Sequence, residues 1–119
     1  MASNRTETPS EPSRSEIDAC AGPLLIEFGA RWCGHCRALQ APLAAALAAY
    51  PAIHHLQIED GPGRPLGRSF AVSLWPTLVF LHQGKEIIRL VRPAAAETIE
   101  QALAALHLRS DNPHCQDLA

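Results

Sequence analysis

Apolar residues in the first half of the chain form one continuous run and then recur at helical spacing. The run PLLIEFGA (23–30) has the length of a strand and is apolar enough to be covered on both faces. A helix over 34–50, which Pro51 ends, is predicted by the apolar positions Leu39, Leu43, Ala46, Leu47 and Tyr50. A short helix within 15–22 is also possible. This half therefore predicts a strand that leads directly into a long helix.

The middle of the chain changes from alternation to loop composition. AIHHLQIE (52–59) alternates apolar and polar residues, which predicts a second strand. DGPGRPLG (60–67) is rich in Gly and Pro, and we interpret it as a loop that leads into a short helix ending near Phe70.

The last part of the chain predicts a hairpin and a final helix. PTLVFLH (76–82) and EIIRLV (86–91) have strand composition and are separated by QGK, whose glycine is a hairpin signal. Pro93 suits the first turn of a helix. One apolar face of that helix is formed by Ile99, Ala102, Leu103 and Leu106.

The order strand, helix, strand, helix, strand, strand, helix predicts an α/β fold, with a central mixed sheet and helices on both faces. Residues 1–15 are rich in Ser, Thr, Glu and Pro, so we expect a flexible N-terminal segment. The folded domain is expected over 16–108, and the polar residues 109–119 are expected to form a flexible C-terminal tail.

Composition restricts the classes of partner. At 119 residues the chain is one domain, large enough to bury a core without metal or disulfides. The net charge of -2 gives no electrostatic basis for binding nucleic acid or an anionic membrane, and no apolar run approaches a membrane span. MASNRTETPSEPSRSE (1–16) has no apolar core of a secretory signal, so we expect a cytoplasmic protein.

Two of the four cysteines stand in RWCGHC (31–36), a pair that could bind metal, form a structural disulfide or exchange disulfides. A zinc site needs about four ligands. The chain has one CxxC, and its other candidate ligands, His107, His114 and Cys115, lie near the C-terminal end. We therefore predict no metal and no cofactor. Cys20 and Cys115 are interpreted as incidental thiols.

The motif and its surroundings resemble the thioredoxin superfamily over about residues 23–106. The resemblance rests on WCGHC (32–36) directly after a strand, on Pro76 ahead of another strand and on the Gly84 hairpin. IEFGARWCGHC is most similar to the active site of protein disulfide isomerases, which have Glu in the strand and Gly-His between the cysteines. The resemblance implies a thioredoxin fold and thiol–disulfide exchange.

Two positions depart from the pattern of that superfamily. Pro42 lies one residue further from the second cysteine than the family's helix-kinking proline. Arg92 stands where the family has a glycine after the last strand, and we expect it to reshape the surface that faces substrates.

The expected helix supplies the chemistry of the cysteine pair. Cys33 would stand at the helix N-terminus, where the dipole and free N–H groups favour a thiolate, the attacking species. Cys36, one turn further, would be shielded and would resolve the mixed disulfide that Cys33 forms with a substrate.

Glu27 is a carboxylate inside an apolar strand, which is costly unless it has a partner or protonates. Burial alone would raise its pKa and suit it to accept a proton. The resemblance assigns this position to the residue that takes the proton from Cys36; a solvent-facing strand edge is the alternative. His55 occupies the place of a lysine near that acid in the family, and it either couples to Glu27 or faces solvent.

His35 is expected to set the redox potential. When protonated it places positive charge beside the Cys33 thiolate, which stabilises the reduced form and makes the disulfide more oxidising. We expect a potential between those of thioredoxin, about -270 mV, and protein disulfide isomerase, about -180 mV.

The resemblance also implies a substrate surface. The peptide bond between Trp75 and Pro76 is expected to be cis, and the Trp75 backbone would bind an extended substrate segment. Trp32 and Gly34 are expected on the same surface. Arg92 lies roughly where isomerases have an arginine that swings toward the resolving cysteine, and a solvated arginine is the alternative.

Together these features predict a monomeric, cytoplasmic thiol–disulfide oxidoreductase that reduces, and in some settings isomerises, protein disulfides. The resemblance implies a thioredoxin reductase as electron donor. The alternative is a thioredoxin-like module that binds peptides, as a chaperone or assembly factor, without redox turnover.

Overall fold

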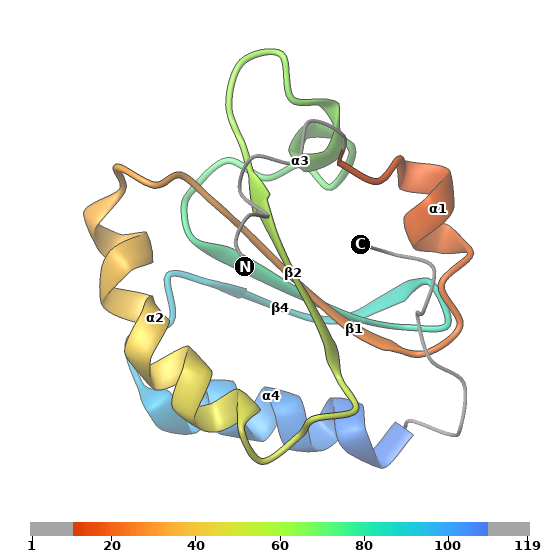
Figure 1. Cartoon of the computed structure of the whole chain (residues 1–119), viewed down its shortest axis with the longest axis vertical. Helices are drawn as coiled ribbons and strands as arrows, with labels where there is room; N and C mark the ends of the chain where they lie inside the picture. Colours follow the sequence, from red (N-terminus) through yellow and green to blue (C-terminus); the bar gives the residue numbers. More distant parts are fainter. Residues whose placement is uncertain (1–10, 110–119) are drawn as a thin grey trace, which may run out of the picture.

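The structure, a computed structural model, describes residues 11–109, and within them the chain forms four helices and four strands (Figure 1). In chain order these are α1 (Arg14–Asp18), β1 (Pro23–Gly29), α2 (Gly34–Leu47), β2 (His54–Glu59), α3 (Pro65–Ser69), β3 (Thr77–His82), β4 (Lys85–Val91) and α4 (Ala96–Arg109). Most of the segment predicted to be flexible, 1–15, and all but the first residue of the predicted tail, 109–119, lie outside the described residues.

The strands form one mixed sheet in the order β2-β1-β3-β4. β1 pairs in parallel with β2 and antiparallel with β3, and β3 and β4 form the predicted hairpin. Gly84 lies in its turn at a φ of 77°, and a Cβ there would clash with the backbone of Asp18. The predicted α/β fold with a mixed sheet is confirmed.

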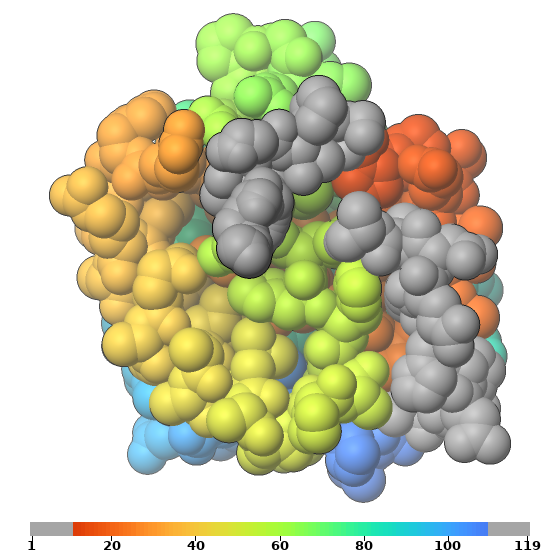
Figure 2. All heavy atoms as spheres, viewed as in Figure 1, coloured from red at the N-terminus to blue at the C-terminus, as the bar shows by residue number. Residues whose placement is uncertain are grey.

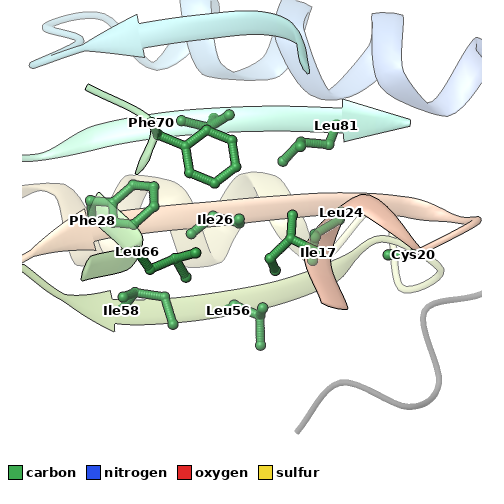
Figure 3. Close-up of a cluster of buried hydrophobic side chains, with 11 residues drawn as sticks. Ile17, Cys20, Leu24, Ile26, Phe28, Leu56, Ile58, Leu66, Phe70 and Leu81 are labelled. Carbon is green, nitrogen blue, oxygen red and sulfur yellow. The ribbon is translucent and has the colours of Figure 1, made fainter. Parts of the chain in front are cut away.

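Side chains of β1 alternate between the two faces of the sheet and define two cores. Leu24, Ile26 and Phe28 point into a cluster with residues of α1 and α3, shown in Figure 3. In that cluster the ring of Phe70 packs beside that of Phe28, with centroids 5.7 Å apart. Leu25 points the other way, into a cluster with residues of α2 and α4. Helices therefore cover both faces of the sheet, as predicted.

The N-terminal helix α1 is short and is held by an N-terminal capping box and by one buried side chain. Ser13 and Glu16 form a capping box, in which each side chain accepts a hydrogen bond from the other residue's backbone N–H. Ile17 is fully buried in the cluster of Figure 3. The helix spans Arg14–Asp18 and so ends earlier than the 15–22 segment proposed from the sequence.

Helix α2 covers one flank of the sheet, in orange and yellow in Figures 1 and 2, and buries Leu39, Leu43 and Ala46. Pro42 lies inside the helix, where it lacks the N–H that would bond to the carbonyl of Ala38. The helix nevertheless continues to Leu47, three residues short of the predicted end, and residues 48 and 49 form a turn after it.

The last helix begins at Ala96 and not at Pro93, so the predicted N-terminus is wrong. Arg92 takes a left-handed conformation, with a φ of 48°, and residues 93–95 form an irregular connection before the chain becomes helical. None of the helices between residues 11 and 109 has the length and apolar character that a membrane crossing requires.

Candidate active site

Cys33 and Cys36 are free thiols at the junction where β1 leads into α2. Cys33 is the N-cap residue of α2, and its Sγ accepts a hydrogen bond from the backbone N–H of Cys36 at 3.3 Å. This geometry is that of an N-cap side chain, which accepts from a backbone N–H that has no partner inside the helix. The first turn of the helix thus points its free donors at the sulfur of Cys33.

Burial, hydrogen bonding and charge together separate the pKa values of the two thiols. Burial raises the pKa of Cys33, but hydrogen bonds from the Cys36 thiol and from the N–H groups of Cys36 and His35, together with the charge of Arg92, outweigh it, so the pKa is lowered. Burial, the hydrogen bond to Cys33 and the charges of Cys33 and Glu27 raise the pKa of Cys36 to about 11. Cys33 is therefore the thiol that forms a thiolate more readily.

Gly29, at the end of β1, leaves the space that the sulfur of Cys36 occupies. A Cβ at this position would lie 2.6 Å from Cys36 Sγ, closer than two such atoms can approach. The end of β1 can therefore lie directly against the sulfur of Cys36 only because residue 29 has no side chain.

Glu27 is buried, with 5% of its surface exposed, on the α2-facing side of β1. The register of the sheet surrounds it with polar residues: Gln57 of β2 lies directly opposite, and His55 lies two residues earlier on the same face. The alternative of a solvent-facing strand edge is therefore wrong, because β1 is a central strand covered by α2.

Three side chains hydrogen-bond to the Glu27 carboxylate. Gln40 Nε2 donates to Glu27 Oε2 at 2.6 Å, and His55 Nε2 lies 3.0 Å from Glu27 Oε1. Gln57 Nε2 donates to Glu27 Oε1 at 3.3 Å and to Gln40 Oε1 through a second contact of 3.0 Å. Gln40 Nε2 also donates to the carbonyl of Cys36 at 3.0 Å, which links the carboxylate to the first turn of α2.

These bonds decide the acidity of Glu27. Burial raises its pKa, but the hydrogen bonds from His55, Gln40 and Gln57 and the charge of His55 outweigh burial, so the pKa lies below its ordinary value. The sequence-based expectation of a raised pKa is wrong, because it considered burial without the three donors. Glu27 is ionised at neutral pH and keeps a negative charge beside Cys36.

The loop before β3 forms the opposite wall of the site. The peptide bond between Trp75 and Pro76 is cis, as predicted. The Trp75 ring packs against the cluster of Ala30, Cys33 and Cys36, and it meets the ring of Trp32 edge-on with centroids 5.2 Å apart. Trp75 Nε1 donates to Asp60 Oδ2 at 2.8 Å, which fixes the indole. Trp32 is 69% exposed.

Arg92 contacts the same loop. Its backbone N–H donates to the carbonyl of Pro76 at 2.9 Å, and its Nε donates to the carbonyl of Trp75 at 2.7 Å. Its charge lowers the pKa of Cys33. The arginine is exposed and is attached to the loop opposite the cysteines. The swing toward Cys36 that the resemblance implies stays a prediction.

Gly34 and His35 lie in the exposed first turn of α2. The backbone N–H of His35 contributes to the lowered pKa of Cys33. The expected effect of its imidazole on the redox potential stays a prediction.

Sequence reasoning missed Gly29, Gln40, Gln57 and Asp60. Gln57 could have been found by aligning β1 and β2 in parallel with Glu27 at the centre, since polar residues at 55 and 57 share one face. Gln40 lies one helical turn after Cys36, a spacing that places both on the same side of α2. Nothing in the sequence pairs Asp60 with Trp75, because that contact joins two loops.

The other two cysteines, Cys20 and Cys115, lie outside the CxxC motif. Cys20 is buried and disulfide-bonded, so its interpretation as an incidental thiol is wrong. Cys115 and His114 lie outside the described residues. Between residues 11 and 109, no three His, Cys, Asp or Glu side chains gather in a group that could hold a metal ion.

Comparisons with known proteins agree with this geometry. The family model described as thioredoxin matches residues 6–105. The chain is similar to the structure of thioredoxin 2 from Pseudomonas aeruginosa PAO1 in its reduced form, with a TM-score of 0.75 and 54% identity over 83% of this chain and 92% of that chain.

Two curated relatives show how far the similarity extends in sequence. Protein disulfide-isomerase A2 of Pongo abelii is 46% identical over 65 residues, which are 51% of this chain. The chain spans only 12% of the length of that relative. Thioredoxin of Chlamydia trachomatis serovar D is 39% identical over 72 residues, which cover 60% of this chain and 70% of the relative.

Proposed function

This chain belongs to the thioredoxin family, and from that premise we propose that it is a thiol–disulfide oxidoreductase that reduces protein disulfides through a reversible Cys33–Cys36 disulfide. The observation that carries the proposal is the difference in acidity between two adjacent free thiols. The pKa of Cys33 is lowered at the start of α2, whereas that of Cys36 is raised to about 11. Such a pair provides one attacking thiolate and one thiol held in reserve.

The reaction follows from these acidities in two exchanges. The Cys33 thiolate attacks one sulfur of a substrate disulfide; a bond forms between Cys33 and that sulfur, the substrate disulfide breaks, and the released thiolate takes a proton. Cys36 then loses its proton and attacks Cys33 Sγ, which forms the Cys33–Cys36 disulfide and releases the second substrate thiol. The dithiol is oxidised by two electrons and the substrate is reduced by two.

Glu27 has the role of moving the proton of Cys36. Its carboxylate is ionised and therefore able to accept a proton, and its lowered pKa means that the proton does not stay there. His55 contacts Glu27 and is partly exposed, so it connects the buried carboxylate to solvent. His35, which stands between the two cysteines in the sequence, is the residue that tunes the potential toward the oxidising side.

The surface around Cys33 is where an extended substrate segment docks. Trp32 and Gly34 form its exposed side, and Trp75 and Pro76 form the opposite wall. Substrates are proteins with accessible disulfides, and a thioredoxin reductase returns the two electrons. We place the protein in the cytoplasm as a monomer, since net reduction needs a reducing compartment. Cell fractionation and sedimentation test the location and the monomeric state.

The test is the reduction of insulin disulfides by dithiothreitol, followed by precipitation of the freed chain. The wild-type protein should accelerate precipitation, and Cys33→Ser should abolish the acceleration. Reduced Cys36→Ser, mixed with insulin in the absence of dithiothreitol, should retain the attack and accumulate a mixed disulfide with insulin, detected by mass spectrometry. A folded wild-type protein that gives no acceleration would instead support a peptide-binding module without redox turnover.

A further inference from the structure

Arg92 is held in an unusual position at the site. It takes a left-handed φ of 48°, a region that a residue with a side chain rarely adopts. The hydrogen bond from its backbone N–H to the carbonyl of Pro76 fixes that conformation where β4 ends. The conformation turns the side chain back toward the loop that faces the cysteines.

The guanidinium of Arg92 binds a backbone acceptor in the loop that packs against the cysteines. Its Nε donates to the carbonyl of Trp75 at 2.7 Å, and the Trp75 ring packs against Cys33. An arginine has five N–H donors in a planar fork. Within residues 11–109 the other four N–H groups of Arg92 make no hydrogen bond. The bond through Nε therefore leaves a charged fork with unused donors at the loop that packs against the cysteines.

Two exposed charges next to the motif have the same sign as Arg92. Arg31 and Arg37 flank the motif, both exposed, and Arg92 approaches from the opposite loop. The acidic side chain in contact with this wall is Asp60, whose Oδ2 accepts from the indole of Trp75. The whole chain carries a net charge of -2, so this positive rim is a local feature.

We propose that Arg92 determines substrate specificity by favouring protein disulfides that have an acidic residue next to the cysteine attacked by Cys33. This inference rests on the oxidoreductase function proposed above. A carboxylate beside the attacked sulfur would meet the free N–H groups of the fork, which suit bidentate binding of a carboxylate. Arg31 and Arg37 attract the same segment at longer range.

The proposal is tested with three disulfide-linked peptides that are identical except for the residue next to the cysteine, which is Glu, Gln or Lys. The measured quantity is kcat/KM for their reduction by the wild type, Arg92→Gln and Arg92→Lys. The wild type should prefer the Glu peptide to the Gln peptide by a factor of about 2 to 5, the range of one partly exposed ion pair. The preference should lie in KM.

The variants separate charge from the bond to Trp75. Arg92→Gln keeps a donor of similar reach without charge and should lose the preference, while Arg92→Lys should retain most of it. Dividing each variant's rates by the wild type's cancels the intrinsic reactivity of each peptide. Arg89→Gln is the matched control, because it removes the same charge from β4, where Arg89 is paired with Glu86, and it should keep the preference. High salt should weaken the preference of the wild type.

The outcomes distinguish this inference from the function on which it rests. Equal kcat/KM for the Glu and Gln peptides, or a preference unchanged in Arg92→Gln, would overturn the role of Arg92 and leave the oxidoreductase intact. If the wild type reduces none of the three peptides, the proposed function fails, and the role of Arg92 fails with it.

Discussion

Replacing Gln40 by Ala removes the shortest hydrogen bond to the buried Glu27 carboxylate. Gln40 Nε2 lies 2.6 Å from Glu27 Oε2, and the same amide also reaches the carbonyl of Cys36. The Cys36 carbonyl is able to keep a backbone partner inside α2, so the main loss falls on the carboxylate. That carboxylate is buried and charged at neutral pH, and it retains only His55 and the longer bond from Gln57.

The expected loss follows from the type of bond. A hydrogen bond to a charged group contributes about 1.5–3 kcal/mol to stability. Gln40 is exposed on its outer side, so water can replace part of the bond, and we take the lower end of about 1.5 kcal/mol. With a urea m-value of about 1–3 kcal/mol/M, the midpoint of unfolding should fall by about 0.5–1.5 M.

The effect should depend on pH in a defined direction. The pKa of Glu27 is lowered in the folded protein, so its contribution to stability is fully present above the unfolded value, about 4.3, and is lost as the pH falls through the folded pKa. The difference between Gln40→Ala and the wild type should therefore be largest at neutral pH and shrink on acidification.

The assay is urea unfolding of both proteins across an acidic to neutral pH series. Gln101→Ala is the matched control, since it makes the same exchange on an exposed position of α4, and it should leave the midpoint nearly unchanged. Gln57→Ala should cost less than Gln40→Ala, because its bond to Glu27 is 3.3 Å long. If Gln40→Ala unfolds at the same midpoint as Gln101→Ala at neutral pH, the reasoning on Glu27 is refuted.

Three further predictions concern the cysteines and their neighbours. Alkylation by iodoacetamide should modify Cys33 with a midpoint below that of an ordinary thiol and leave Cys36 slow until the pH nears 11; equal pH profiles for both thiols would contradict the asymmetry. Gly29→Ala should destabilise the reduced protein by about 1–3 kcal/mol in urea unfolding, because its Cβ would overlap Cys36 Sγ; full stability would show that the sulfur moves freely. His35→Pro should make the Cys33–Cys36 couple more reducing by tens of millivolts in glutathione buffers; an unchanged potential would remove His35 from the account.

Periodicity was sufficient to predict the sheet and its covering helices. The apolar run of β1 predicts a strand buried on both faces, and the helical spacing after Cys36 predicts a helix with one buried face. Both burial patterns are found in the structure. Element ends were less predictable. Pro93 is compatible with a first helical turn, but the left-handed Arg92 delays the helix to Ala96, and nothing local in the sequence signals that conformation.

The cysteine pair and the unusual position of Glu27 were also predictable, because each breaks the pattern of its own segment. The direction of the pKa of Glu27 was not, since it depends on donors from two other elements. The pairing register of β1 and β2 places His55 and Gln57 next to the carboxylate. Gln40 contacts it because its face of α2 is turned toward β1. Contacts of this kind follow from three-dimensional packing and not from spacing along the chain.

The central claim is that Cys33 and Cys36 form a reversible two-electron couple poised for protein disulfide exchange. The most direct measurement is the equilibrium redox titration of this couple in glutathione buffers, with the oxidation state of Cys33 and Cys36 read by mass spectrometry after alkylation. We expect one two-electron transition between about -270 and -180 mV. A pair that stays reduced or stays oxidised across the whole titration would contradict it.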